Sequence, residues 1–165
     1  MPVSAFLSPA YVIFSAGMNY KASDDFNMML SPLTSKTTIV VKEGAEGVDE
    51  TQYGIKEGER IYREVGAYLK IHYKFNITKE ISAENDLTLF SNYQYKPQNL
   101  DLDLKSELNF KINKNIKALI SLHFIYDDDS KIPYIERNEN GEDVTKYTVG
   151  LQFQEKIMIG IGANF

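Results

Sequence analysis

Residues 65–77 read VGAYLKIHYKFNI, and residues 100–112 read LDLDLKSELNFKI. In both stretches apolar side chains recur at every second position, with Ser106 as an exception, and most of the side chains between them are polar or charged. A helix would scatter these charges around its circumference, whereas a strand sorts them onto one face. Each stretch therefore predicts a β-strand with one apolar face and one charged face.

The same period of two extends through most of the chain. Alternating stretches also occupy residues 12–20, 26–30, 87–95, 118–126 and 147–165. Several are longer than the usual strand of about five to six residues, and about 9–11 residues of tilted strand cross a membrane. We therefore expect about seven long strands and no helix of consequence, in an all-β, antiparallel, up-and-down transmembrane β-barrel.

The composition narrows the classes of function. The chain has 165 residues, a formal net charge of -5, 43% hydrophobic residues and no cysteine. This length predicts one domain, and the lack of cysteine excludes disulfides, thiol catalysis and cysteine-based zinc sites. An acidic pI near 5.1 argues against nucleic acid as a partner. No apolar run is long enough for a transmembrane helix, but membrane strands average to an ordinary mean hydropathy, here -0.32.

Aromatic residues fall near the ends of the predicted strands. A barrel would place one group at one rim and a second group at the other: Tyr20, Tyr73, Phe75, Phe110 and Phe165, then Tyr11, Tyr93, Tyr95, Phe124 and Tyr126. Two such girdles are typical of strands that cross a membrane between its two interfaces.

The connections predict an orientation. Short turns alternate with longer loops, the former at residues 21–25, 76–82 and 113–115 and the latter at 42–60, 96–99 and 127–143. Outer-membrane barrels keep short turns on the periplasmic side. This assignment depends on residues 147–165 forming one strand, because a hairpin turn at residues 154–156 would invert every loop. The unbroken alternation through Phe153, Glu155 and Ile157 favours one strand.

The strand count bears on domain organisation. Seven strands that end in the periplasm place Met1 outside the cell, whereas single-chain bacterial barrels have even strand counts. Residues 1–11 also lack the basic and apolar regions of a signal peptide. We therefore expect residues 1–165 to be a single β-barrel domain that lacks N-terminal strands and a signal peptide.

Two groups of residues are candidate metal ligands. His72 and His123 are both expected to point inward from different strands and could join a carboxylate, but they lack a short ligand spacing, and polar packing of the lumen is favoured. Residues 127–129 are three aspartates that could gather Ca²⁺, but the D-x-D-x-D-G pattern is absent and a solvated acidic loop is favoured.

Charged residues on the inward faces admit two arrangements: Glu64, Lys70, Lys74, Asp101, Asp103, Lys105, Glu107, Lys111 and Lys117. A narrow barrel would lock them into a ladder of ion pairs, and a wide one would leave them lining a wet channel. The acidic, glycine-containing loop at residues 42–60 is either a ligand-binding lid or an ordinary mobile loop. No G-x-S-x-G motif is present, so we expect no enzyme and assign no catalytic, cofactor-binding or metal-binding residue.

The chain also resembles a known family. Residues 89–129, LFSNYQYKPQNLDLDLKSELNFKINKNIKALISLHFIYDDD, together with FLSPAYV at 6–12, MLSP at 29–32 and LQFQEKIMIGIGANF at 151–165, resemble the C-terminal portion of an uncharacterised outer-membrane β-barrel family of Bacteroidetes-type bacteria, a domain of unknown function. The resemblance implies a bacterial cell outer-membrane location, further N-terminal strands and a signal peptide. It supplies no catalytic residue.

The C-terminus predicts a partner. Ile157, Ile159, Ile161, Ala163 and the terminal Phe165 resemble the signal that the barrel-assembly machinery reads on the last strand. We therefore expect the lipid bilayer and this machinery as partners, a small solute as a further candidate, and no cofactor. The expected function is a passive pore or binding scaffold. The alternatives are a membrane-embedded lipid-modifying enzyme and a soluble β-barrel carrier of an apolar ligand.

Overall fold

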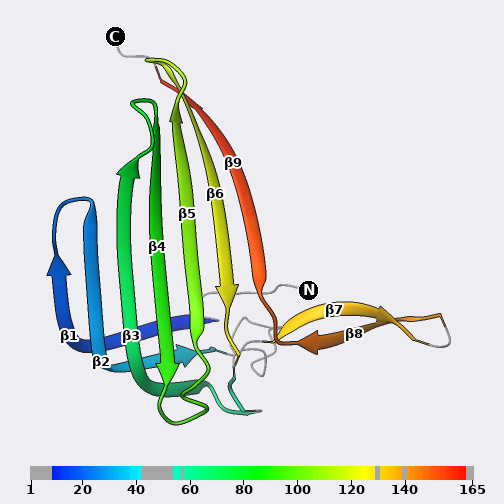
Figure 1. Ribbon diagram of the computed structural model, residues 1–165. Helices are drawn as coiled ribbons and strands as arrows, with labels where there is room; N and C mark the ends of the chain where they lie inside the picture. The colour runs from blue at the N-terminus through cyan, green and yellow to red at the C-terminus, as the bar shows by residue number, and fades with distance from the viewer. Residues whose placement is uncertain (1–8, 42–53, 57, 129–130, 139–140, 163–165) are drawn as a thin grey trace.

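A computed structural model describes residues 9–41, 54–56, 58–128, 131–138 and 141–162. Within these residues the chain forms antiparallel strands and no helix (Figure 1). The strands are β1 (Ala10–Lys21), β2 (Phe26–Ile39), β3 (Ile61–Asn76), β4 (Ile81–Asn92), β5 (Asp101–Lys111), β6 (Ile116–Tyr126), β7 (Ile132–Arg137), β8 (Asp143–Thr148) and β9 (Gln152–Ile161). The predicted all-β, antiparallel fold class is confirmed.

Seven strands form one sheet in the order β1-β2-β3-β4-β5-β6-β9, and β7 and β8 form a separate hairpin. Each strand pairs with the next one in the chain up to β6, which pairs with β9 because the β7–β8 hairpin is inserted between them. Among the described strands the sheet is open, since β1 and β9 are its two edges. The turns that follow β1, β3 and β5 lie at one end of the sheet with the end of β9, and the longer connections lie at the other, as the sequence predicts (Figure 1).

The single strand predicted at residues 147–165 is wrong in its first part. Tyr147 belongs to β8, and residues 149–151 separate that strand from β9. The alternation continues across this break, so it could not reveal where one strand ends and the next begins. The alternative turn at residues 154–156 is also wrong, because these residues lie inside β9, where they pair with residues 121–123 of β6.

A bulge in β2 bends the sheet. The strand holds one more residue than β1 between Leu30 and Leu33, and one more than β3 between Ser31 and Thr34, so the register shifts against both neighbours. Pro32 lies inside this bulge, where its missing N–H costs no ladder hydrogen bond. The Ser31 hydroxyl lies 2.7 Å from the Ala16 carbonyl oxygen and 2.9 Å from that of Leu33, and these contacts hold the bulge closed.

Two glycines allow the strands to approach closely at this bend. A Cβ atom at Gly17 would lie 2.2 Å from the Leu30 carbonyl oxygen, and one at Gly66 would lie 2.0 Å from that of Ser91. Beyond the bend, parts of β1, β2 and β3 turn beneath the upright strands (Figure 1). The bend therefore makes one face of the sheet concave and carries the end of β2 toward β5 and β6.

The register sorts side chains onto two faces. One face carries apolar rows that run from strand to strand. The longest crosses all seven strands through Tyr20, Met28, Ile71, Leu87, Leu104, Phe124 and Phe153. Large apolar side chains of this face are exposed, with Phe14 and Met18 each at 72% and Ile161 at 82%.

The described residues have almost no conventional core. The buried apolar residues are Val40, Ile55, Ala83 and Phe90. The chain exposes 11714 Å², against about 8,300 Å² expected for a compact monomer of this mass. The apolar face of the sheet is thus left uncovered within the described structure.

Candidate functional site

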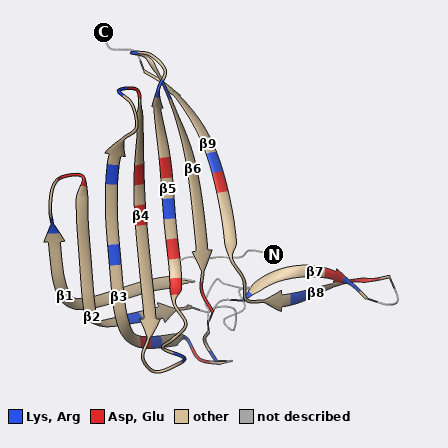
Figure 2. Ribbon diagram, in the orientation of Figure 1, with Lys and Arg blue, Asp and Glu red and all other residues tan. Residues whose placement is uncertain are grey.

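The opposite, concave face of the sheet carries the polar and charged residues. One row crosses six strands through Asn27, His72, Asp86, Lys105, His123 and Gln154. The row beside it contains Lys74, Glu84, Glu107, Ser121 and Lys156. Figure 2 shows charged residues recurring along β3, β4 and β5. The candidate site is built on this face.

Lys36 joins three strands at the bend. Its Nζ atom lies 3.2 Å from Oδ2 of Asp101 on β5, 3.4 Å from Oε2 of Glu64 on β3 and 3.8 Å from Oδ2 of Asp127 after β6. The Glu64 side chain is only 2% exposed and also accepts a hydrogen bond from Asn92. Buried charges must be paired and hydrogen-bonded, and this cluster meets that requirement.

A cavity of about 180 Å³ adjoins the Lys36 cluster. Phe90 and Ile125 supply apolar wall, Thr34 and Thr88 supply hydroxyls, and Asp103 supplies a carboxylate. The Lys36 ammonium lies 5.3 Å from the centroid of the Phe90 ring, which adds a cation–π contact. The cavity can hold a small molecule that combines an apolar part with a polar or charged group.

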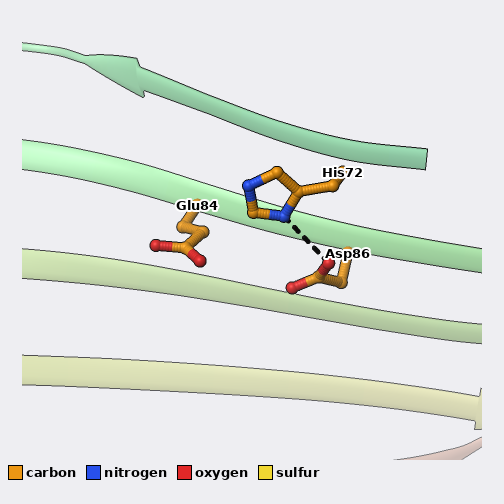
Figure 3. A group of neighbouring side chains, drawn as sticks. All are labelled: His72, Glu84 and Asp86. Carbon is orange, nitrogen blue, oxygen red and sulfur yellow. Dashed lines mark hydrogen bonds and ion pairs between the residues drawn. The ribbon is translucent and has the colours of Figure 1, made fainter. Parts of the chain in front are cut away.

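Two histidine–aspartate pairs lie farther along the same face. Nδ1 of His72 is 3.0 Å from Oδ1 of Asp86, and Nε2 of His123 is 2.8 Å from Oδ1 of Asp103. Glu84 joins only the first pair, and the ligand atoms of His72, Glu84 and Asp86 all lie within 4.8 Å of one another (Figure 3). Among the residues that the structure describes, this is the one such group of three.

The two histidines do not share a site. They occupy the same row, as expected for two inward-pointing residues, but β4 and β5 lie between their strands. Three strand spacings separate them by about 14 Å. A metal site built from both His72 and His123 is therefore excluded.

Comparison with known families places the chain. A family model described as "Protein of unknown function, DUF481" matches residues 12–154. The chain belongs to the DUF481 family. No curated protein and no solved structure matches it. The predicted membership of a family of unknown function is confirmed, while a Bacteroidetes-type origin stays a prediction. In the described part of this DUF481 chain no helix is long and apolar enough to cross a membrane.

The predicted charged face of the DUF481 chain is confirmed, and part of it forms ion pairs. Lys105 Nζ lies 2.7 Å from Oε1 of Glu107. Asp101 and Glu64 meet at Lys36, and Asp103 meets His123. The face thus holds a partial ladder of ion pairs, part of it beside the cavity, and lies between the two arrangements that the sequence left open.

The aspartates at residues 127–129 diverge. Asp127 contacts Lys36, and Asp128 accepts a hydrogen bond from the Asn99 amide. Asp129 and most of the loop at residues 42–60 lie outside the described residues. The first two aspartates of the run therefore face different partners, and the structure does not bring them to one calcium site.

Sequence reasoning missed Lys36, the centre of the cluster. The expected second strand stopped at residue 30, and Pro32 hid its continuation to Ile39. A signal was present, because Thr34, Lys36 and Thr38 alternate with Leu33, Ser35 and Thr37. The bulge shifts this alternation by one residue, so it does not continue the pattern of residues 26–30.

The β7–β8 hairpin stands apart from the polar face. Its strands pair from Ile132 with Thr148 to Arg137 with Asp143. On its exposed surface, the hydrogen bond and charge of Glu136 raise the pKa of the Lys146 ammonium above its ordinary value. No site residue predicted from the sequence lies in the described part of this hairpin.

Proposed function

We propose that this DUF481 protein is an integral β-barrel protein of the bacterial outer membrane whose polar interior serves as a passive pore or binding scaffold. The observation that carries the proposal is the sorting of side chains by face. Apolar rows cross the sheet on the convex face and stay exposed, while charged residues gather on the concave face. A lipid-facing exterior and a polar interior have this pattern.

The strand lengths agree with the proposal. The strands of the main sheet contain 10 to 16 residues, and about 9–11 tilted residues span the hydrocarbon layer. Aromatic rings also meet near the end of the sheet that holds the short turns. The ring centroids of Phe26 and Tyr73 are 6.0 Å apart, and those of Tyr73 and Phe75 are 5.3 Å apart. Such rings suit a membrane interface.

The membrane proposal requires the two sheet edges to be covered. Each unpaired backbone N–H or C=O group at an edge strand would cost about several kcal/mol in hydrocarbon, because no water is present there to form a hydrogen bond with it. We propose that further strands pair with β1 and β9 and complete the barrel. Ile157, Ile159 and Ile161 on β9 are the described part of the segment proposed to bind the barrel-assembly machinery.

The direction of curvature favours a membrane barrel over a soluble carrier. A carrier of an apolar ligand would need its apolar face on the concave side. Here the bend places Lys36, Glu64 and Asp101 on the concave side, in contact with one another, and leaves Phe14 and Met18 on the outside. A carrier built on this curvature would have its charges inside and its apolar surface in water.

A lipid-modifying enzyme has less support. Such an enzyme would need a nucleophile beside a histidine and an acid. Within the described residues His72 and His123 each bind an aspartate, but neither makes a hydrogen bond with a serine. We therefore propose a role without catalysis.

Membrane fractionation tests the proposal. The chain would be expressed in a Gram-negative host behind an added signal peptide, and the outer membrane would be separated from soluble fractions. We expect recovery in the outer membrane, extraction only by detergent, and a folded form whose gel mobility changes on heating. Recovery as a soluble monomer without detergent would overturn the proposal. Conductance of the purified protein in planar bilayers then separates an open pore from a closed binding scaffold.

A further inference from the structure

The structure assigns a binding site for one divalent transition-metal ion to His72, Glu84 and Asp86 on the polar face. We infer Zn²⁺ as the probe ion that fits the donors best. This site goes beyond the proposed function, since a passive barrel requires no metal.

The strand pairing brings the three donors together. His72 lies directly opposite Asp86 in the register of β3 and β4, and Glu84 is two residues from Asp86 on the same strand. Residues two apart on a strand share a face, so all three side chains project from one side of the sheet. Figure 3 shows them side by side on the two neighbouring strands. The positions are thus fixed by backbone pairing and not by a loop.

The distances suit a small ion after slight side-chain movement. Three atoms that lie within 4.8 Å of one another are all within about 2.8 Å of a common point. Bonds from Zn²⁺ to imidazole nitrogen or carboxylate oxygen measure about 2.0–2.2 Å. Rotations that move each donor by less than about 1 Å close this difference.

The donor set selects among metals. One imidazole with two carboxylates suits Zn²⁺ and its first-row neighbours, whereas Ca²⁺ and Mg²⁺ prefer oxygen ligands alone. The side chains of His72 and Asp86 are 28% and 41% exposed, so water can supply a fourth ligand. An ion here would link β3 to β4 through their side chains.

The nearest cations do not occupy the site. Lys105 lies opposite Asp86 in the register, but its ammonium contacts Glu107 at 2.7 Å. Lys74 lies opposite Glu84, and within the described residues the two make no ion pair. The carboxylates of Glu84 and Asp86 therefore remain accessible to a metal ion.

The same face provides a matched control. His123 and Asp103 form a second histidine–aspartate pair at 2.8 Å. The neighbours of His123 across the sheet are Lys105 on β5 and Gln154 on β9, and within the described residues no second carboxylate completes a group of three metal ligands there. The two pairs differ chiefly in that Glu84 lies beside the first pair. A comparison of the two therefore measures what a third ligand contributes to metal binding.

Zinc titration tests the site. The full chain, purified without a polyhistidine tag, would be titrated with ZnCl₂ by calorimetry and against a chromophoric indicator. We expect one Zn²⁺ per chain, no displacement by an equal concentration of Ca²⁺, and at least a tenfold loss of affinity in His72→Ala. The variant His123→Ala should bind as the unaltered chain does.

Milder substitutions keep the test decisive if His72→Ala does not fold. Glu84→Gln and Asp86→Asn preserve shape and should each weaken Zn²⁺ binding at least tenfold, whereas Asp103→Asn should leave it unchanged. Equal effects of the two sets, a stoichiometry other than one, or no binding would overturn the site. Because the titration works in any medium that keeps the chain folded, its failure leaves the membrane proposal intact, and failure of the fractionation experiment leaves the zinc site intact.

Discussion

Lys36 and Asp101 are 65 positions apart in the sequence, yet the Lys36 ammonium donates a hydrogen bond to the Asp101 carboxylate at 3.2 Å. The first lies on β2 beyond the bulge, and the second begins β5. Strands β3 and β4 separate them along the sheet, so the contact spans the concave face. This pair helps to hold the curvature of the sheet, and the curvature defines which face is inside and which is outside.

Removing the cation should destabilise the bend. Lys36→Met would leave the buried Glu64 carboxylate without the ammonium, and breaking a buried pair costs about 3–5 kcal/mol. Denaturant unfolding should therefore show a clearly lower free energy of unfolding. The control Lys146→Met removes a lysine from the exposed β8 and should change little. Equal stability of the two variants would mean that the cluster does not hold the bend.

Close approach of the strands should make Gly66 intolerant of a side chain. In Gly66→Ala the new Cβ would meet the Ser91 carbonyl oxygen at 2.0 Å, and this backbone atom cannot rotate away. We expect a loss of about 1–3 kcal/mol, as for other overpacked sites. A Cβ at Gly160 on β9 meets nothing within 4 Å, so Gly160→Ala should be neutral or slightly stabilising. Thermal unfolding of both variants compares the positions directly, and a neutral Gly66→Ala would contradict the close approach.

The bulge should depend on its serine. Ser31→Ala removes a fully buried hydroxyl that binds the Ala16 and Leu33 carbonyl oxygens. Leaving buried acceptors unsatisfied costs about 1–3 kcal/mol. Denaturant unfolding should show this loss, and hydrogen exchange should accelerate first at residues 15–18 and 31–34. Faster exchange confined to β6 or β9 would place the effect elsewhere.

The two faces should respond differently to an added charge. Leu104→Lys places a cation in the longest apolar row, and a lysine on a lipid-facing strand surface costs about 2–4 kcal/mol at the bilayer midplane and less toward the interfaces. Thr88→Lys places the same charge on the polar face, opposite Asp103. We expect the yield of protein folded in the outer membrane to fall for Leu104→Lys alone. Similar yields for the two variants would contradict a lipid-facing exterior.

The sequence predicts some strands better than others for physical reasons. The stretch at residues 100–112 became β5 nearly unchanged, because its alternation is regular and its neighbours pair without a shift. Strand β2 was predicted only in its first part, because the extra residue at Pro32 and Leu33 breaks the alternation. Contact across several strands, which no local pattern encodes, set the partners of Lys36.

The candidate metal group illustrates the same limit. His72 was identified from its type and its strand, and its inward direction followed from the alternation. Glu84 and Asp86 were not connected with it, because the turn at residues 77–80 sets which residue of β4 lies opposite His72. A shift of one residue in that turn would move both carboxylates to the other face.

The β7–β8 hairpin has a consequence for the order in which the sheet assembles. β5 and β6 are joined by residues 112–115, whereas β9 reaches β6 only after residues 127–151. Closing the longer connection as a flexible chain costs about 1.6 kcal/mol more entropy than closing the shorter one. A hairpin that forms early shortens this connection and brings Gln152 back beside β6. Pairing of β9 therefore depends on a local event outside the main sheet.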